Sequence, residues 1–445
     1  MDSLPPKLIS RVLDYIIPDG CHRIHPGISL ATYATLNRRW QAVIERCTFA
    51  YLYINTPSRL EEFQQLVSTP RRRSCVQVVD LCVQLEQYDE KARARVETDE
   101  ERQRNNRIFT TTISTLFRIL SDWPDNSGIS IEISAWSPSD FLVFKERKRR
   151  KRVTGSRVDD LFKKRYERSY LEFPRETADA ECPRIPTVRK LSIQGIANAW
   201  VIEPASSVYI TMKLPRLNRL DLALTDDCKW DKQLRQRLRN GKLDYIGKQC
   251  RQYLLTSFRD FARKLHLSPA SVRHFELAYS YMPPRDQNYY PPDVTEGGTD
   301  LLRSYLRDFS QRLEVLRTNG PVVLGPELFL PSNLQVDNLV NLPFWPNLID
   351  VSVEYAGVTP CGEWLLDRDP EEDEDEDEEL TMDDIFGDEE QTYPEYVRIP
   401  LEDCKSSYFR TRIIAGHVDR LYERFLVPRM PLNRNEQADS LVSRH

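Results

Sequence analysis

Apolar residues recur at helical spacing near the start of the chain. The first stripe follows two prolines, which a first helical turn tolerates, and consists of Leu8, Ile9, Val12, Leu13 and Ile16. A second helical pattern continues through 30–45 and includes Trp40. Together they predict a small helical unit over residues 1–55. A unit this short leaves much of its apolar surface in water, so it needs a partner, either the rest of the chain or another protein.

Beyond this unit, helical and extended patterns alternate along the chain. Apolar and polar residues alternate at 76–85 and 129–136, which predicts strands, and the segment 107–123 between them has helical spacing. Ser58 and Glu61 form an S-x-x-E capping box for a further helix over 58–67. The order of helix then strand predicts parallel strands joined by helices.

Several later segments share the order apolar, two polar, apolar, polar, apolar, which is the core of a leucine-rich-repeat strand. They begin at residues 188, 217, 272, 313 and 348, and the segment at 313 is the poorer match. The distances between successive starts are irregular, at 29, 55, 41 and 35 residues. The sequence therefore predicts an irregular leucine-rich-repeat-like α/β solenoid over residues 56–366. An ordinary α/β domain with similar strands is the alternative.

Charge is distributed unevenly, although the formal net charge is only −5. Sixteen of the 68 acidic residues but one of the 63 basic residues lie between Asp367 and Glu390, so the remainder is basic, with 62 basic and 52 acidic residues. We expect an acidic insert at 367–392 and a basic insert at 145–165 to be disordered. Residues 393–445 are expected to form a strand and a helix, near 405–426, that cap the α/β domain.

The basic run 147–152 has three interpretations: a nuclear import signal, a phosphate-binding patch or a solvated, disordered insertion. It contains no aromatic residue, which argues against stacking on single-stranded nucleic acid and against nucleic acid as a partner. The acidic insert is most simply a solvated linker. Its alternatives are binding of basic proteins such as histones, mimicry of nucleic acid, or folding back on the basic run.

Motifs of catalysis are absent from the sequence. With six histidines and no G-x-S-x-G, P-loop, H-E-x-x-H or dinucleotide fingerprint, we expect neither an enzyme nor a cofactor. Cys21, His22 and His25 offer zinc ligands, but a structural site needs four, so polar loop residues are the favoured interpretation. Nine irregularly spaced cysteines indicate reduced thiols, and no apolar run reaches membrane-spanning length. We expect a protein of the cytoplasm or nucleus with no membrane partner.

The N-terminal unit resembles an F-box. Leu4 and Pro5 open its first helix, and the later segment 30-LATYATLNRRWQAVIE-45 places a basic pair before Trp40, with Asn37 where the family commonly has a small or thiol residue. The segments 38-RRWQAVIERCTFAYLYI-54 and 85-LEQYD-89 resemble filamentous-fungal proteins that follow such a start with an irregular leucine-rich-repeat-like region. In the family, this three-helix unit binds the Skp adaptor, which joins it to a cullin–RING ubiquitin ligase.

The resemblance implies which residues form the adaptor-binding site and the small core of the unit. Nine positions match the pattern: Leu4, Pro5, Leu8, Ile9, Val12, Leu13, Leu30, Leu36 and Trp40. It further implies a non-catalytic substrate-recognition subunit of a Skp–cullin–F-box ligase, whose α/β body binds an unknown protein substrate. The alternative is a nuclear scaffold that binds chromatin proteins or nucleic acid through its acidic and basic inserts, with the N-terminal helices as a lid on the body.

Overall fold

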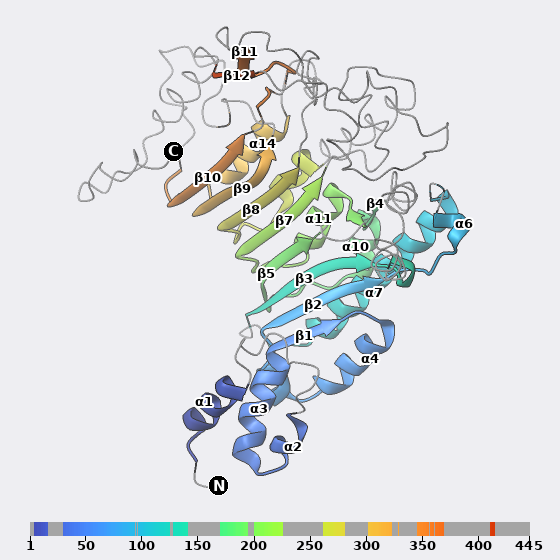
Figure 1. The fold of residues 1–445 in the computed structure, drawn as a ribbon, viewed down its shortest axis with the longest axis vertical. Helices are drawn as coiled ribbons and strands as arrows, with labels where there is room; N and C mark the ends of the chain where they lie inside the picture. Colours follow the sequence, from blue (N-terminus) through green and yellow to red (C-terminus); the bar gives the residue numbers. More distant parts are fainter. Residues whose placement is uncertain are drawn as a thin grey trace, which may run out of the picture.

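Eight parallel strands form one sheet whose spatial order is the order of the sequence (Figure 1). A computed structural model describes residues 4–16, 30–93, 95, 97–124, 128–140, 170–194, 200–225, 261–280, 301–322, 328, 345–355, 357–359, 361–368 and 410–413. Three helices precede the sheet: α1 (Pro6–Ile16), α2 (Ala31–Ala34) and α3 (Arg38–Ala50). The expected α/β class with a parallel sheet is confirmed.

Seven strands of the sheet lie in segments where apolar alternation predicts them. They are β2 (Val78–Gln84), β3 (Ile129–Trp136), β5 (Val188–Gln194), β7 (Arg219–Thr225), β8 (His274–Ser280), β9 (Val315–Val322) and β10 (Asp350–Tyr355). The eighth, β1 (Tyr51–Ile54), lies in the segment assigned to the N-terminal unit, yet it pairs in parallel with β2. The helical unit therefore ends at Ala50, and the sheet begins at the next residue.

Helices connect the strands and lie on one face of the sheet (Figure 1). They are α4 (Pro57–Leu66), α5 (Pro70–Arg73), α6 (Glu90–Arg93), α7 (Asp99–Ser121), α10 (Arg175–Glu181), α11 (Pro204–Thr211), the 3-10 helix η1 (Leu265–Leu267) and α14 (Leu301–Ser310). Phe109, Ile113 and Phe117 repeat at helical spacing on α7 and are fully buried, as are Ile131 and Ile133 of β3. These side chains belong to one continuous core between the sheet and its helices. We call the sheet together with these helices the α/β body (residues 51–355).

The start of α4 differs from the expected capping box. Thr56 is the N-cap, because its hydroxyl accepts a hydrogen bond from the backbone N–H of Arg59 at 3.2 Å. Pro57 follows at the first helical position, where its missing N–H costs nothing. Ser58 thus lies inside the first turn, and the capping box predicted for Ser58 and Glu61 is wrong.

Two further strand pairs lie outside the main sheet. β4 (Tyr170–Leu171) pairs in parallel with β6 (Val201–Ile202), and β11 (Leu366–Arg368) pairs antiparallel with β12 (Arg410–Ile413). β12 replaces helix at the four described residues of the helix expected near 405–426, since Thr411 and Ile413 are β-branched residues that favour extended backbone. The rest of that expected helix lies outside the described residues. The basic insert at 145–165, the acidic residues 369–392 and most of 393–445 lie outside the described residues.

Candidate protein-binding surfaces

The three N-terminal helices have a core of their own. Both α1 and α2 pack on α3, and the buried apolar side chains form a cluster separate from the core of the α/β body. Its members are Ile9, Leu13, Leu30, Trp40, Val43 and Ile44. Residues 4–16 and 30–50, which we call the helical unit, therefore fold around this small cluster.

Asn37 determines where α3 begins. Its side-chain oxygen accepts hydrogen bonds from the backbone N–H groups of Arg39 and Trp40, at 2.9 and 3.1 Å. These two donors have no partner within the helix, so the side chain supplies what the first turn lacks. The Tyr33 ring stacks on Trp40 with centroids 6.3 Å apart. The residue that departs from the F-box pattern at position 37 thus acts as a helix cap.

A second apolar stripe on α1 faces solvent. Leu8, Val12 and Tyr15 follow at steps of four and three residues and are 45%, 42% and 90% exposed. That spacing places them on one face of the helix, beside the buried stripe of Ile9 and Leu13. A helix that only covered its own core would carry polar residues at the exposed positions, so the apolar arc of α1 is wider than the unit's core can cover.

The nine residues expected at the adaptor site fall into two groups. Four are buried in the helical unit and hold its helices together without reaching the surface: Ile9, Leu13, Leu30 and Trp40. The others are accessible, Leu4 partly and the rest largely: Leu4, Pro5, Leu8, Val12 and Leu36. Tyr15 and Tyr33 are also exposed. Sequence reasoning missed these two, although the spacing of Tyr15 from Leu8 and Val12 placed it on their face.

The second candidate surface is the face of the sheet opposite its helices. Alternate residues of each strand point away from the core, and the strand register aligns them in rows across the sheet. The central row is rich in charge and consists of Tyr53, Asp80, Glu132, Ser192, Asp221, Glu276, Arg317 and Ser352. Sequence alternation predicted strands in these segments, but only the register shows which charges are neighbours.

Ion pairs neutralise the middle of this face. The Asp221 carboxylate lies 3.1 Å from Lys190 Nζ and 2.8 Å from Arg219 Nε, and Arg219 also reaches Glu276 at 3.0 Å. The hydrogen bond to Asp221 raises the pKa of Arg219. The acidic side chains of β7 and β8 on this face, Asp221 and Glu276, therefore have cationic partners.

The β1 and β2 side of the face is acidic and aromatic. The Tyr51 hydroxyl donates a hydrogen bond to Asp80. Burial, aided by the neighbouring Cys82 and Asp80, raises the pKa of Tyr53 to about 12, and burial also raises the pKa of the Cys82 thiol. Both groups are neutral near pH 7, so neither is an activated nucleophile.

A buried carboxylate joins the loops that follow β2 and β3. Asp140 accepts hydrogen bonds from the Tyr88 hydroxyl at 2.6 Å, the Trp200 indole N–H at 3.0 Å and the Ser137 backbone N–H at 2.7 Å. Ser139 fixes the same loop, because its hydroxyl donates to the Tyr88 carbonyl at 2.6 Å. With three donors on its two oxygens, Asp140 is a structural acceptor and not a candidate acid or base.

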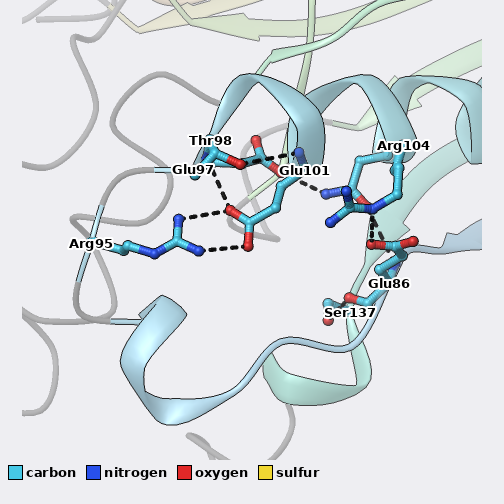
Figure 2. A network of polar contacts seen from close by, with 8 residues as sticks. Glu86, Arg95, Glu97, Thr98, Glu101, Arg104 and Ser137 are labelled. Carbon is cyan, nitrogen blue, oxygen red and sulfur yellow. Dashed lines mark hydrogen bonds and ion pairs between the residues drawn. The ribbon is translucent and has the colours of Figure 1, made fainter.

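Ionic contacts occupy the N-terminus of α7 (Figure 2). Thr98 and Glu101 form a reciprocal capping box, so α7 begins eight residues before the expected start at 107. Arg95 binds the Glu101 carboxylate through two nitrogens at 2.8 and 2.9 Å, and Arg104 contacts Glu86 at 2.8 Å. A helix N-terminus attracts anions, but here the chain's own carboxylates take that place. We therefore assign this cluster a structural role.

The part of the chain that the structure describes contains no cluster of three or more His, Cys, Asp and Glu side chains able to hold a metal ion. Cys21, His22 and His25 lie outside it. None of the described helices combines the length and apolar character needed to cross a membrane. Comparison of the chain with protein families, curated proteins and solved structures gave no match.

Proposed function

We propose that this chain is a non-catalytic substrate-recognition subunit of a Skp–cullin–F-box ubiquitin ligase. The helical unit serves as an F-box-like element that binds the Skp adaptor. The α/β body is an irregular leucine-rich-repeat-like solenoid that binds a protein substrate. Ubiquitin transfer belongs to the other subunits of the ligase.

The observation that carries this proposal is the double apolar character of α1. One stripe, which contains Ile9 and Leu13, is buried in the unit's own core. The other stripe, Leu8, Val12 and Tyr15, is exposed to solvent. Exposed aliphatic and aromatic side chains on a rigid helix are the kind of residues that supply most of the binding energy in protein interfaces. A partner that covers α1 would bury surface that the chain itself leaves exposed.

The topology of the sheet supports the second half of the proposal. Strands that follow one another in the sequence are neighbours in the main sheet and pair in parallel. The stacked units of a solenoid are arranged in the same way. The described helices that connect the strands lie on one face, so no described helix covers the other face (Figure 1). The mixed charges and aromatic residues of that face suit a protein ligand better than a small apolar molecule.

The packing of the helical unit favours docking over the lid of the scaffold alternative. A lid would direct its apolar side chains into the body, but α1 and α2 pack on α3 and share a separate cluster with it. The acidic and basic inserts on which the scaffold alternative depends lie outside the described residues.

Co-purification of the full-length chain with a recombinant Skp adaptor tests the proposal. We expect the unchanged chain to bind at micromolar concentration and Leu8→Ser with Val12→Ser to abolish binding. The matched control is Arg11→Ser, which changes an exposed polar residue of the same helix. Thermal unfolding of each variant checks that the fold is retained. No adaptor binding by the unchanged chain, or equal binding by the double variant, would overturn the proposal.

A further inference from the structure

The connections that lead into β5, β7, β8 and β9 are basic. Because these strands are parallel, their N-terminal ends share one edge of the sheet (Figure 1). Taken from the end of the preceding helix to the second residue of the strand, the connections are 182–189, 212–220, 268–275 and 311–316. Their seven basic residues are Arg184, Arg189, Lys213, Arg216, Arg219, Arg273 and Arg312. Their one acidic residue, Glu314, lies 3.4 Å from His274 Nε2.

Three arginines of this edge are held by backbone carbonyls instead of carboxylates. One guanidinium nitrogen of each donates to a carbonyl: Arg189 to Arg216 at 3.2 Å, Arg273 to Ala270 at 2.7 Å and Arg312 to Ser268 at 3.1 Å. A carbonyl orients a guanidinium group but leaves its charge in place. Within the described residues none of the three arginines forms an ion pair. Since a guanidinium has five N–H donors, each arginine keeps donors for a ligand.

Arg189, Asn218 and Arg273 lie in one row at the start of three strands. The Asn218 backbone N–H donates to the Arg189 carbonyl at 2.8 Å, and the Arg273 backbone N–H donates to the Asn218 carbonyl at 2.8 Å. Neighbouring strands are about 4.8 Å apart, so the backbones of the two arginines are about 10 Å apart. Residues of one row direct their side chains to the same side of a sheet. The exposed Asn218 amide therefore lies between the two arginines.

Arg312 extends this row toward β9. The Glu314 backbone N–H donates to the Arg273 carbonyl at 2.7 Å, which brings the connection that contains Arg312 beside Arg273. The Arg312 guanidinium lies over the Phe309 ring, 4.5 Å from its centroid, and its Nε is buried without a hydrogen-bond partner among the described residues. Burial, together with the charge of Arg273, lowers the pKa of Arg312. Arginine stays protonated in proteins, so Arg312 is a fixed charge that an anion would stabilise.

These features favour a ligand with several carboxylates. A guanidinium group binds a carboxylate through two parallel hydrogen bonds. Other cations of this edge already pair with carboxylates of the chain, since Lys213 lies 3.3 Å from Asp179. Nucleic acid is the other common polyanion. Phe275 is the only Phe, Tyr or Trp residue of the four connections and is buried, so unpaired bases would find no ring on which to stack.

We infer that Arg189, Asn218, Arg273 and Arg312, which we call the basic edge, bind a segment of the protein substrate that is rich in aspartate and glutamate. The inference rests on the proposed receptor function and gives its substrate a chemical class. Each carboxylate would accept hydrogen bonds from a guanidinium group that is already oriented, so little order is created on binding. A basic segment would be repelled, and a wholly apolar one would desolvate the guanidinium groups without a partner.

A peptide-binding assay with the full-length chain tests this inference. The probe is a fluorescein-labelled twelve-residue peptide of glycine and serine with four glutamates, and its partner probe carries glutamines at those four positions. Anisotropy is measured at low and high salt, because an ionic contact weakens with salt. We expect Arg189→Gln with Arg273→Gln to weaken binding of the glutamate peptide by roughly tenfold. Equal binding of the glutamine peptide, or an unchanged affinity of the double variant, would overturn the inference.

Control variants separate the basic edge from other charged parts of the chain. Arg107→Gln removes an exposed arginine from α7 and is expected to leave the affinity unchanged. A second chain carries Gln throughout the basic run 147–152 and Asn or Gln throughout the acidic run 371–379, so that neither run attracts or displaces the peptide. The loss caused by the double variant must persist in this chain. If neutralising 147–152 alone abolishes binding, the inference is wrong.

Two further measurements make the result specific. Arg273→Lys keeps the charge without the planar guanidinium and is expected to lose less affinity than Arg273→Gln, while thermal unfolding checks that each variant is folded. A fluorescein-labelled oligothymidine is the nucleic-acid probe, and the double variant is expected to change its affinity by less than about twofold. A tenfold loss of oligothymidine binding with no loss of peptide binding would assign the basic edge to nucleic acid and overturn the inference.

Adaptor binding distinguishes failure of this inference from failure of the proposed function. Arg189→Gln with Arg273→Gln is expected to bind the Skp adaptor as the unchanged chain does. Leu8→Ser with Val12→Ser is expected to lose the adaptor and keep the glutamate peptide, because α1 lies outside the basic edge. Adaptor binding by a chain that does not bind the peptide would overturn the inference alone. Peptide binding by a chain that does not bind the adaptor would overturn the receptor function and leave the basic edge as a site for acidic segments.

Discussion

Glu45 of α3 and Arg71 of α5 form an ion pair at 3.0 Å that joins the helical unit to the α/β body. The Glu45 side chain is only 11% exposed, and it is also 3.7 Å from Arg72 and accepts a hydrogen bond from Gln41 at 3.1 Å. Arg72 in turn lies over the Phe49 ring of α3. The junction between the two parts is therefore a packed polar contact and not a free linker.

Glu45→Gln tests the strength of this junction. We expect the free energy of unfolding to fall by about 1–2 kcal/mol, because two arginines lose a mostly buried carboxylate. Glu62→Gln is the matched control, since the Arg59–Glu62 pair is exposed and should contribute less than about 0.5 kcal/mol. Urea denaturation measures both, and equal effects would show that the junction adds nothing.

Leu13 and Leu8 separate folding from binding on α1. Leu13→Ala empties a fully buried site and should lower the free energy of unfolding of the helical unit by about 2–5 kcal/mol. Leu8→Ala removes a half-exposed side chain and should cost less than about 1 kcal/mol. Thermal unfolding compares the two variants. A larger loss for Leu8→Ala would mean that α1 packs with the opposite face inward.

Asp140→Ala is expected to be among the most destabilising single changes in the body. It removes the carboxylate that accepts from Tyr88, Trp200 and Ser137, and each buried hydrogen-bond partner that is lost costs about 1–3 kcal/mol. Urea denaturation measures the loss, and a fall of less than about 1 kcal/mol would contradict the assigned role. Asp140→Asn keeps one acceptor oxygen and should lose less.

Glu132 gives a pH-dependent contribution of known sign. Its pKa in the folded chain is raised above 4.5 by burial and by Asp80 and Asp221, against the opposing charge of Lys190. The ionised group therefore destabilises the folded chain near pH 7, and this cost disappears as the pH falls through the raised pKa toward 4.5. Glu132→Gln should stabilise the chain at pH 7 by less than about 1 kcal/mol, because solvent screens the partly exposed group. Denaturation at pH 4 should show no gain.

Strands with long apolar alternation were predictable from the sequence, as β3 shows, because its expected bounds of 129–136 are those of the structure. β1 was not, since Tyr51–Ile54 is short and follows a helix without any turn residue. The α4 cap was misassigned because Ser58 fits a capping motif, but the neighbouring Pro57 fits the first helical position better. Local patterns give the type of an element more reliably than its ends.

The candidate surfaces were only partly predictable for a different reason. Periodicity shows that α1 is apolar, but Leu8 and Leu13 are alike as sequence, and only the packing of α3 decides which of them is buried. The pairing of Asp80 with Glu132 depends on the register of strands some 50 residues apart in sequence, which alternation cannot give.

Because α3 leads directly into β1, it fixes the orientation of the exposed stripe of α1 relative to the exposed face of the sheet. Ala50 ends α3 and Tyr51 begins β1, so no linker residue separates α3, on which α1 packs, from the edge strand of the sheet. The 13 residues of α3 span about 20 Å and act as a rigid arm. One alanine inserted in α3 would rotate a partner bound to α1 by about 100° around the axis of α3 relative to the sheet. The exposed stripe of α1 and the exposed sheet face would themselves be unchanged. A ligase built on this chain would present its substrate from one fixed angle.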